Sequence, residues 1–121
     1  MEKILIVEDD EVVRIIIKKC LEHRFNIDEA VDGDIALRLI LEIEYDLIIT
    51  DIGMPNMNGT SLARTTHQVF PKLPFIVIST ITSDYTTFKS EYPNIKAWIQ
   101  KPFKPSLLIG MVDGVFGGHL D

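Results

Sequence analysis

The chain is poor in cysteine, since Cys20 is the only one among its 121 residues. A disulfide within the chain and a metal cluster built from cysteines are both excluded. Long apolar runs are also missing, and none approaches the roughly 20 residues that cross a bilayer. The run Ile4 to Val7 is too short for a signal peptide, and acids follow it. We therefore expect a cytoplasmic protein without a membrane association.

Positive charge is scarce as well. Twelve Lys and Arg residues stand against 18 Asp and Glu residues, which gives a net charge of −6. Direct binding of nucleic acid needs clustered basic residues, so this composition argues against it. The three histidines, His23, His67 and His119, are scattered without metal-ligand spacing, and we interpret them as surface residues. Hydrophobic residues make up 46% of the chain, enough for the core of one compact domain over residues 1–121.

Short apolar segments alternate with longer amphipathic ones. We predict five strands, of which the first, third and fourth are nearly continuous apolar runs, as in strands covered on both faces. The strands are Lys3–Val7, Asn26–Ala30, Asp46–Thr50, Phe75–Ser79 and Ile95–Ile99.

Apolar residues at spacings of three and four predict helices between the strands. The clear ones are Glu11–His23, Asp34–Ile43, Ser61–Phe70 and Pro105–Phe116. The fourth of five helices, in "SDYTTFKSEYP" at 83–93, has β-branched threonines and stops at a proline, so we expect it to be short or mobile. This alternation predicts a three-layer α/β fold with a parallel sheet.

Chemically active residues collect where the predicted strands end, which in an open parallel sheet is the edge that binds ligands. They are Glu8, Asp9, Asp51, Ser79, Thr80 and Lys101. Three carboxylates at one edge repel one another unless they bind a cation or a proton. Mg²⁺ prefers such oxygen ligands, and together with a lysine and a hydroxyl it forms a set of parts for phosphoryl transfer. Asp51 could itself be the nucleophile.

Each of these residues also has a structural interpretation. Asp10, next to the acidic pair, fits the N-cap of the first helix. Asp51 could be a turn residue before Gly53, Ser79 could cap a helix, and Lys101 could be an exposed charge. The functional interpretation depends on their coincidence at one edge.

Four segments carry a family resemblance: "ILIVEDD" at 4–10, "DLIITDIGMPNMNG" at 46–59, "PFIVIST" at 74–80 and "KPF" at 101–103. With these motifs in this order, the chain resembles the receiver domain of two-component response regulators over essentially its whole length. The resemblance implies a doubly wound, flavodoxin-like fold with five helices and a parallel sheet of order 2-1-3-4-5.

The resemblance also implies roles for the residues at the sheet edge. Asp51 would accept the phosphoryl group and bind Mg²⁺, with Asp9 as a second direct ligand. Glu8 would act on the metal through water, and the backbone carbonyl of Gly53 would complete the protein ligands. Lys101 would pair with the phosphoryl group. The peptide bond between Lys101 and Pro102 would be cis.

Ser79 and Trp98 would then be the switch pair, with Trp98 at a position usually held by Tyr or Phe. The donor would be the phosphohistidine of a sensor kinase or of a histidine phosphotransfer protein, and the output partner is not indicated. Such a domain is a signalling switch rather than a turnover enzyme. Thr80 replaces a usual Ala or Gly and would narrow access, while Gly53 and Ile81 cannot position a hydrolytic water.

Three other classes compete with this interpretation. A phosphatase of the haloacid dehalogenase type would need a second acid at position 53, where Gly53 stands. A flavodoxin-like electron carrier would need a phosphate loop after the first strand, where the acids Glu8 and Asp9 would repel phosphate. A pseudo-receiver that only binds proteins would be expected to lack part of the acidic set or Lys101. The pseudo-receiver is the main alternative.

Overall fold

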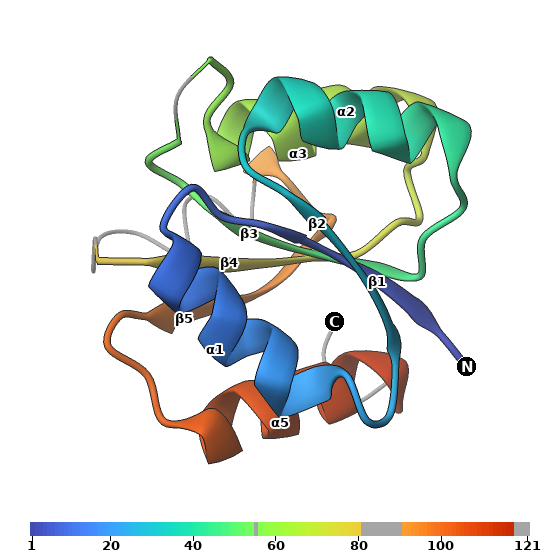
Figure 1. Ribbon diagram of the computed structural model, residues 1–121. Coiled ribbons are helices and arrows are strands. Elements are labelled where there is room, and N and C mark those ends of the chain that lie inside the picture. The colour runs from blue at the N-terminus through green and yellow to red at the C-terminus, as the bar shows by residue number, and fades with distance from the viewer. Residues whose placement is uncertain (55, 81–90, 118–121) are drawn as a thin grey trace.

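A computed structural model of the chain describes residues 1–54, 56–80 and 91–117. Its centre is a parallel sheet with the strand order β2-β1-β3-β4-β5 (Figure 1). The strands are β1 (Lys3–Val7), β2 (Asn26–Ala30), β3 (Leu47–Asp51), β4 (Phe75–Ser79) and β5 (Ile95–Gln100). The expected doubly wound topology is therefore confirmed.

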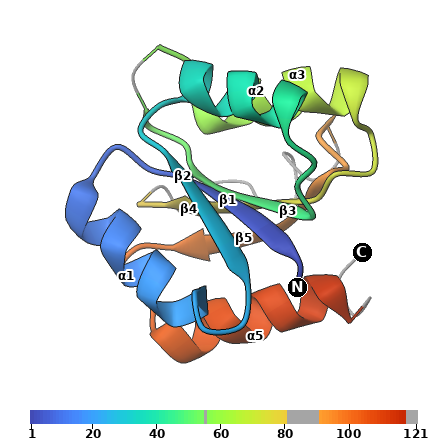
Figure 2. The same ribbon diagram turned by 45° about the vertical axis from the view of Figure 1, so that its right-hand side comes forward.

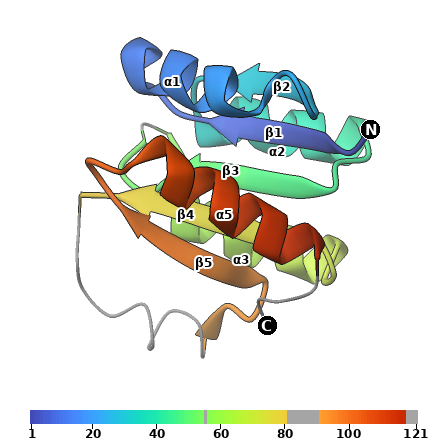
Figure 3. The same ribbon diagram turned by 90° about the horizontal axis from the view of Figure 1, so that it is seen from below.

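Helices cover both faces of the sheet. They are α1 (Glu11–Leu21), α2 (Gly33–Glu42), α3 (Gly59–Val69) and α5 (Pro105–Phe116). The helices α1 and α5 contact each other on one face, and α2 and α3 contact each other on the other (Figures 1 and 2). Figure 3 looks onto the first face, with α5 in front of the sheet and α3 behind it. Most of the predicted fourth helix lies outside the described residues.

Alternation along the buried strands divides the core into two clusters. In β1, Ile4 and Ile6 join the cluster under α1 and α5, whereas Leu5 and Val7 join the cluster under α2 and α3. The residues of β4 are all buried. Burial on both faces explains why these strands read as continuous apolar runs in the sequence.

Several predicted boundaries were wrong by one or two residues. The strand β3 begins at Leu47 rather than Asp46, whose carboxylate accepts a 2.8 Å hydrogen bond from the backbone N–H of Lys3. It continues to Asp51, which pairs with Ile78. At the helix starts, Asp32 and Asn58 are the N-caps, so α2 and α3 begin earlier than their apolar stripes suggest.

Two glycines allow backbone to meet backbone at the starts of α2 and α3. A Cβ atom on Gly59 would lie 2.2 Å from the carbonyl oxygen of Asp51, and one on Gly33 would lie 2.2 Å from the carbonyl oxygen of Met57. Neither contact leaves room for a side chain. The loop after β3 is therefore held between the two helix starts.

Replacing glycine by alanine should have opposite effects at two helical positions. Gly110 in α5 is exposed and a Cβ there meets nothing within 4 Å, so Gly110→Ala should raise the free energy of unfolding by up to about 1 kcal/mol. Gly33→Ala should lower it by about 1–3 kcal/mol, because backbone must move to accept the methyl group. Urea unfolding measures both changes. A shift of the same sign for the two variants would contradict this packing.

Candidate functional site

The acidic residues at the carboxyl ends of β1 and β3 lie together. Glu8 and Asp9 follow β1 directly, and Asp51 is the last residue of the neighbouring strand β3. One carboxylate oxygen from each of the three lies within 4.8 Å of the other two. Glu8 is buried, Asp51 is half-buried and Asp9 is exposed. The structure thus brings together the acids that the sequence places at strand ends.

Lys101 is the cation of this cluster and follows β5. Its Nζ lies 2.7 Å from Oε1 of Glu8 and 3.4 Å from Oδ2 of Asp51. The side chain of Glu8 is only 1% exposed and that of Lys101 16%, so the closer pair is largely shielded from water. A lysine that joins two acids leaves the cluster with an excess of negative charge.

Burial and charge act in opposite directions on the pKa values of Glu8 and Lys101. Burial raises the pKa of Glu8 to about 7, assisted by the charge of Asp51 and opposed by the hydrogen bond and charge of Lys101. For Lys101, burial lowers the pKa, but the hydrogen bond and charge of Glu8 and the charge of Asp51 outweigh it, and the net shift is upward. The lysine is therefore held in its charged form by the acids around it.

Backbone contacts fix Glu8 in its buried position. Its N–H donates to the carbonyl of Ala30, and its carbonyl accepts a 2.9 Å hydrogen bond from Nη1 of Arg14. Arg14 also pairs with Glu29 through Nε at 3.1 Å. The role of Arg14 was missed in the sequence analysis, because an arginine on an amphipathic helix carries no signal of the strand end that it contacts.

Asp10 does cap the first helix, as predicted. One oxygen of its side chain accepts hydrogen bonds from the backbone N–H groups of Val12 and Val13, at 2.9 and 3.2 Å. Its own N–H donates to Oε2 of Glu8 at 3.3 Å. The third acid of "EDD" thus serves the helix start, and the first two face the sheet edge.

The loop after β3 orients Asp51. Oδ1 of Asp51 accepts a 2.8 Å hydrogen bond from the N–H of Ile52, which leaves Oδ2 on the side of Lys101. The backbone of Asn56 is in the left-handed region, with φ of 69°. Gly53 is exposed, and a Cβ there would meet nothing within 4 Å. The structure therefore shows no steric need for glycine at position 53, and the metal role of its carbonyl stays a prediction.

The family model of the response regulator receiver domain matches residues 4–113. The chain belongs to this family.

Relatives of this receiver domain include parts of larger signalling proteins. Histidine kinase P4 of Formosa agariphila is 36% identical over 107 residues, which cover 83% of this chain and 7% of that protein. The chain spans between 7% and 57% of the length of curated relatives that it matches.

Solved structures agree in fold. The receiver domain of the Francisella response regulator 1452 is 28% identical with a TM-score of 0.87, covering 98% of this chain and 99% of that chain. The response regulator protein TrrA of Thermotoga maritima is 27% identical with a TM-score of 0.85, covering 95% and 99%. The TrrA structure is a complex with Mg²⁺ and BeF.

The remaining predicted residues lie near the same edge of the receiver domain. Ser79 is buried at the end of β4, and its carbonyl accepts a 2.8 Å hydrogen bond from the N–H of Lys101. The peptide bond between Lys101 and Pro102 is cis, as the resemblance implied. Thr80 is exposed beside the cluster. Trp98 pairs with Val77 in the sheet and packs, half-buried, against the cluster under α2 and α3.

Two residues singled out in the sequence are not among those that the structure describes. Ile81 and His119 lie outside the described residues, so the expectations for them stay predictions.

Among the described helices, none is both long and apolar enough to span a bilayer.

Removing the charge of Asp51 should stabilise the receiver domain in the absence of metal. Asp51→Asn takes one negative charge from a cluster in which three acids share one lysine, so we expect the free energy of unfolding to rise by on the order of 1 kcal/mol at low salt. Glu44→Gln, at an exposed loop position, should change it by less than about 0.5 kcal/mol. Both are measured by urea unfolding. A loss of stability in Asp51→Asn would show that its bond to Lys101 outweighs the repulsion.

Proposed function

We propose that this receiver domain accepts a phosphoryl group on Asp51 from a phosphohistidine donor in a Mg²⁺-dependent reaction. The observation that carries the proposal is the position of Oδ2 of Asp51, which lies beside two further acids and 3.4 Å from the Nζ of Lys101. A carboxylate in such a site is a nucleophile with a cation at hand for the incoming phosphate oxygens.

The acidic cluster fits a hard divalent cation. Its three carboxylates offer oxygen ligands on one side, and Lys101 neutralises only part of their charge. We assign Asp9 and Asp51 as direct ligands. Glu8 would act through water, because Oε1 of Glu8 is already bound by Lys101. The carbonyl of Gly53 is the fourth proposed protein group. When bound, Mg²⁺ supplies positive charge for the acids and for the phosphate oxygens.

The transfer itself requires little movement of this chain. Oδ2 of Asp51 attacks phosphorus, the O–P bond forms, the N–P bond breaks, and the imidazole nitrogen leaves with the electron pair. Lys101 shifts its hydrogen bond from Glu8 toward the phosphoryl oxygens, over the short distance between its two present partners. Positioning and charge neutralisation carry this chemistry.

The donor has an apolar surface to dock on beside the cluster. A hollow of about 300 Å³ is lined by Val13, Ile16, Thr80, Lys101, Pro102 and Phe103. On the neighbouring face of α1, Val12, Ile15 and Ile16 are exposed. Histidine kinase P4 among the relatives supports a sensor kinase, or a histidine phosphotransfer protein, as the donor. Thr80 is an exposed residue that lines this hollow, and its side chain would limit access to Asp51.

Phosphorylation would be read out through Ser79 and Trp98. A phosphoryl group adds up to about two negative charges and three acceptor oxygens, and the buried Ser79 at the end of β4 is a hydrogen-bond donor near them. A shift of Ser79 would change the packing around Trp98 on β5, and with it the surface offered to an output partner. The domain thus works as a switch. The presence of both the full acidic set and Lys101 supports this function over the pseudo-receiver.

Acetyl phosphate and Mg²⁺ should add one phosphoryl group to the wild-type chain, because the cluster activates small donors as well as protein donors. Asp51→Asn should show no addition, and Asp46→Asn, an exposed acid at the other end of β3, should be labelled like the wild type. Intact-mass measurement detects the product. Equal labelling of Asp51→Asn would assign the acceptor to another residue.

Two neighbouring acids should respond differently to removal. Asp9→Ala should weaken Mg²⁺ binding by at least about tenfold, because it removes a direct carboxylate ligand. Asp10→Ala should leave the affinity nearly unchanged and lower the free energy of unfolding by about 1 kcal/mol, because it removes the N-cap of α1. Calorimetric titration and urea unfolding separate the two effects. Equal loss of Mg²⁺ affinity in both variants would mean that Asp10 shares the metal site.

A further inference from the structure

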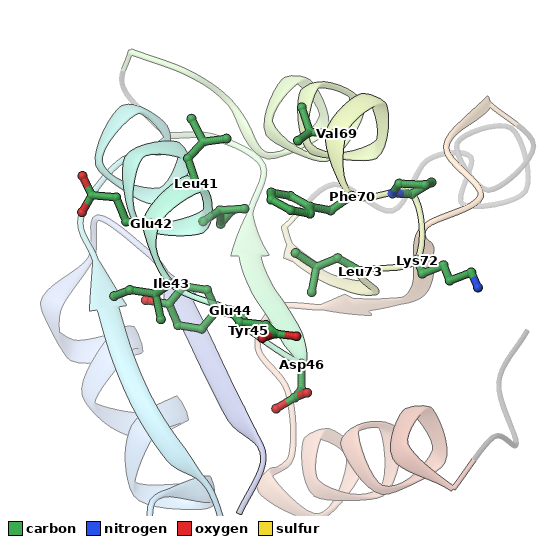
Figure 4. A pocket seen from close by; sticks show the side chains of 12 residues that line it. Leu41, Glu42, Ile43, Glu44, Tyr45, Asp46, Val69, Phe70, Lys72 and Leu73 are labelled. Carbon is green, nitrogen blue, oxygen red and sulfur yellow. The ribbon is translucent and has the colours of Figure 1, made fainter.

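A second hollow lies at the edge of the sheet opposite to Asp51, where β3 and β4 begin. It has a volume of about 680 Å³ and lies between the ends of α2 and α3 (Figure 4). This size falls in the range of about 300–1,000 Å³ that is common for binding pockets. We call it the α2–α3 groove. None of the residues proposed for phosphoryl transfer lines it.

The walls of the groove expose large apolar side chains. Leu41 at the end of α2 is 57% exposed, Val69 at the end of α3 is 53% exposed, and Phe70 is 39% exposed. In Figure 4, Phe70 points from the end of α3 toward the end of α2. A single exposed apolar residue needs no explanation, but three around one hollow form a patch of the kind that binds partners.

The floor of the groove is already in place. Tyr45 is 6% exposed, and its hydroxyl donates a 2.7 Å hydrogen bond to Oδ2 of Asp28 on β2. That bond fixes the ring, which lies beside Ile43 in Figure 4, while the half-buried Leu73 lines the hollow from the start of β4. A groove whose floor is fixed before binding spends little free energy on ordering itself.

The rim of the groove is acidic on the side where α2 leads into β3. Glu44 and Asp46 lie on the connection from α2 to β3, and Lys72 is the one basic residue among those that line the groove. Glu42 is the last residue of α2, and its carboxylate lies on the side of α2 away from α3 (Figure 4). Two acids and one lysine thus lie around the apolar centre, and a third acid lies on the outer side of α2. Charge complementarity favours a ligand that presents positive charge next to an apolar side chain.

We propose that the α2–α3 groove binds a linear peptide segment of a partner protein, in which an aliphatic or aromatic side chain is flanked by Lys or Arg. A second copy of this chain is a poorer occupant, because each copy has a net charge of −6 and would bring the same acidic rim. The groove lies at the edge of the sheet opposite to the phosphoryl-transfer cluster. A partner bound there would hold the receiver domain while leaving Asp51 open to its donor.

The test uses the wild-type chain without phosphodonor, so its result does not depend on the proposed phosphorylation. The probe is the peptide acetyl-Arg-Leu-Arg-Phe-Arg-amide, followed by backbone amide NMR. We expect shifts confined to residues 40–46 and 69–73, apart from Pro71, which has no backbone N–H and gives no signal. Two control peptides, one with Glu for each Arg and one with Ser for Leu and Phe, should cause none, because the first is repelled by the rim and the second lacks an anchor.

Matched variants test the walls and the rim. Leu41→Ser should weaken binding by about tenfold, whereas Leu107→Ser, a leucine on α5 with 45% exposure, should not change it. Glu44→Lys should weaken binding and Lys72→Glu should strengthen it. Glu22→Lys, which makes the same change in net charge as Glu44→Lys at the end of α1, should have little effect.

Three results would overturn the proposal. The first is the absence of shifts in residues 40–46 and 69–73. The second is an equal effect of Glu22→Lys and Glu44→Lys, which would reduce the binding to long-range attraction by an acidic protein. The third is a concentration-dependent dimer in light scattering that Leu41→Ser dissociates, which would make a second copy the occupant.

Discussion

The crowding of three carboxylates around one lysine is the interaction on which the rest of this site depends. Lys101 lies 2.7 Å from Glu8 and 3.4 Å from Asp51, and Asp9 remains toward solvent. Burial makes the ionised form of Glu8 less favourable and raises its pKa, and the nearby charge of Asp51 adds to this effect. The cluster of three acids and one lysine thus has too little positive charge to balance its carboxylates. The proposed Mg²⁺ would supply positive charge that offsets these acids and the negative charge of an incoming phosphoryl group.

The sheet order makes this cluster possible. Because β1 and β3 are neighbours, the acids after β1 lie beside Asp51 without help from long side chains. By contrast, β4 separates β3 from β5, so the side chain of Lys101, which follows β5, must reach across one strand to Asp51. A lysine has the length to do so, and its backbone is anchored by the hydrogen bond from its N–H to the carbonyl of Ser79. The topology therefore explains both the short acids and the long base.

Much of this could be predicted from the sequence, for reasons that differ between elements. The strand β4 was predicted with its observed bounds, because strands buried on both faces leave an uninterrupted apolar run. For β3 the run ended one residue early, since Asp51 is polar and yet belongs to the ladder. The residues of the cluster were predicted because parallel strands bring their carboxyl ends to one edge.

Pairings between side chains could not be predicted in the same way. The sequence places Lys101 at the edge, but only the folded structure shows that its shorter contact is with Glu8 rather than Asp51. Arg14 reaches the backbone of Glu8 across elements that no local pattern connects. Burial and distance between distant segments are properties of the packed chain, and a periodicity of two or 3.6 residues does not contain them.

The close approach of Gly59 to Asp51 limits the directions in which the residues of the site can move. The carbonyl of Asp51 leaves no space for even a methyl group on the α3 side, and its Oδ1 is tied to the N–H of Ile52. The main chain of α3 and of Ile52 thus packs closely against Asp51 on this side. Any displacement caused by added negative charge must be taken up on the other side, by Lys101 and by the ends of β4 and β5. Rigidity at one flank of Asp51 would thereby give a direction to the conformational response that we propose for phosphorylation.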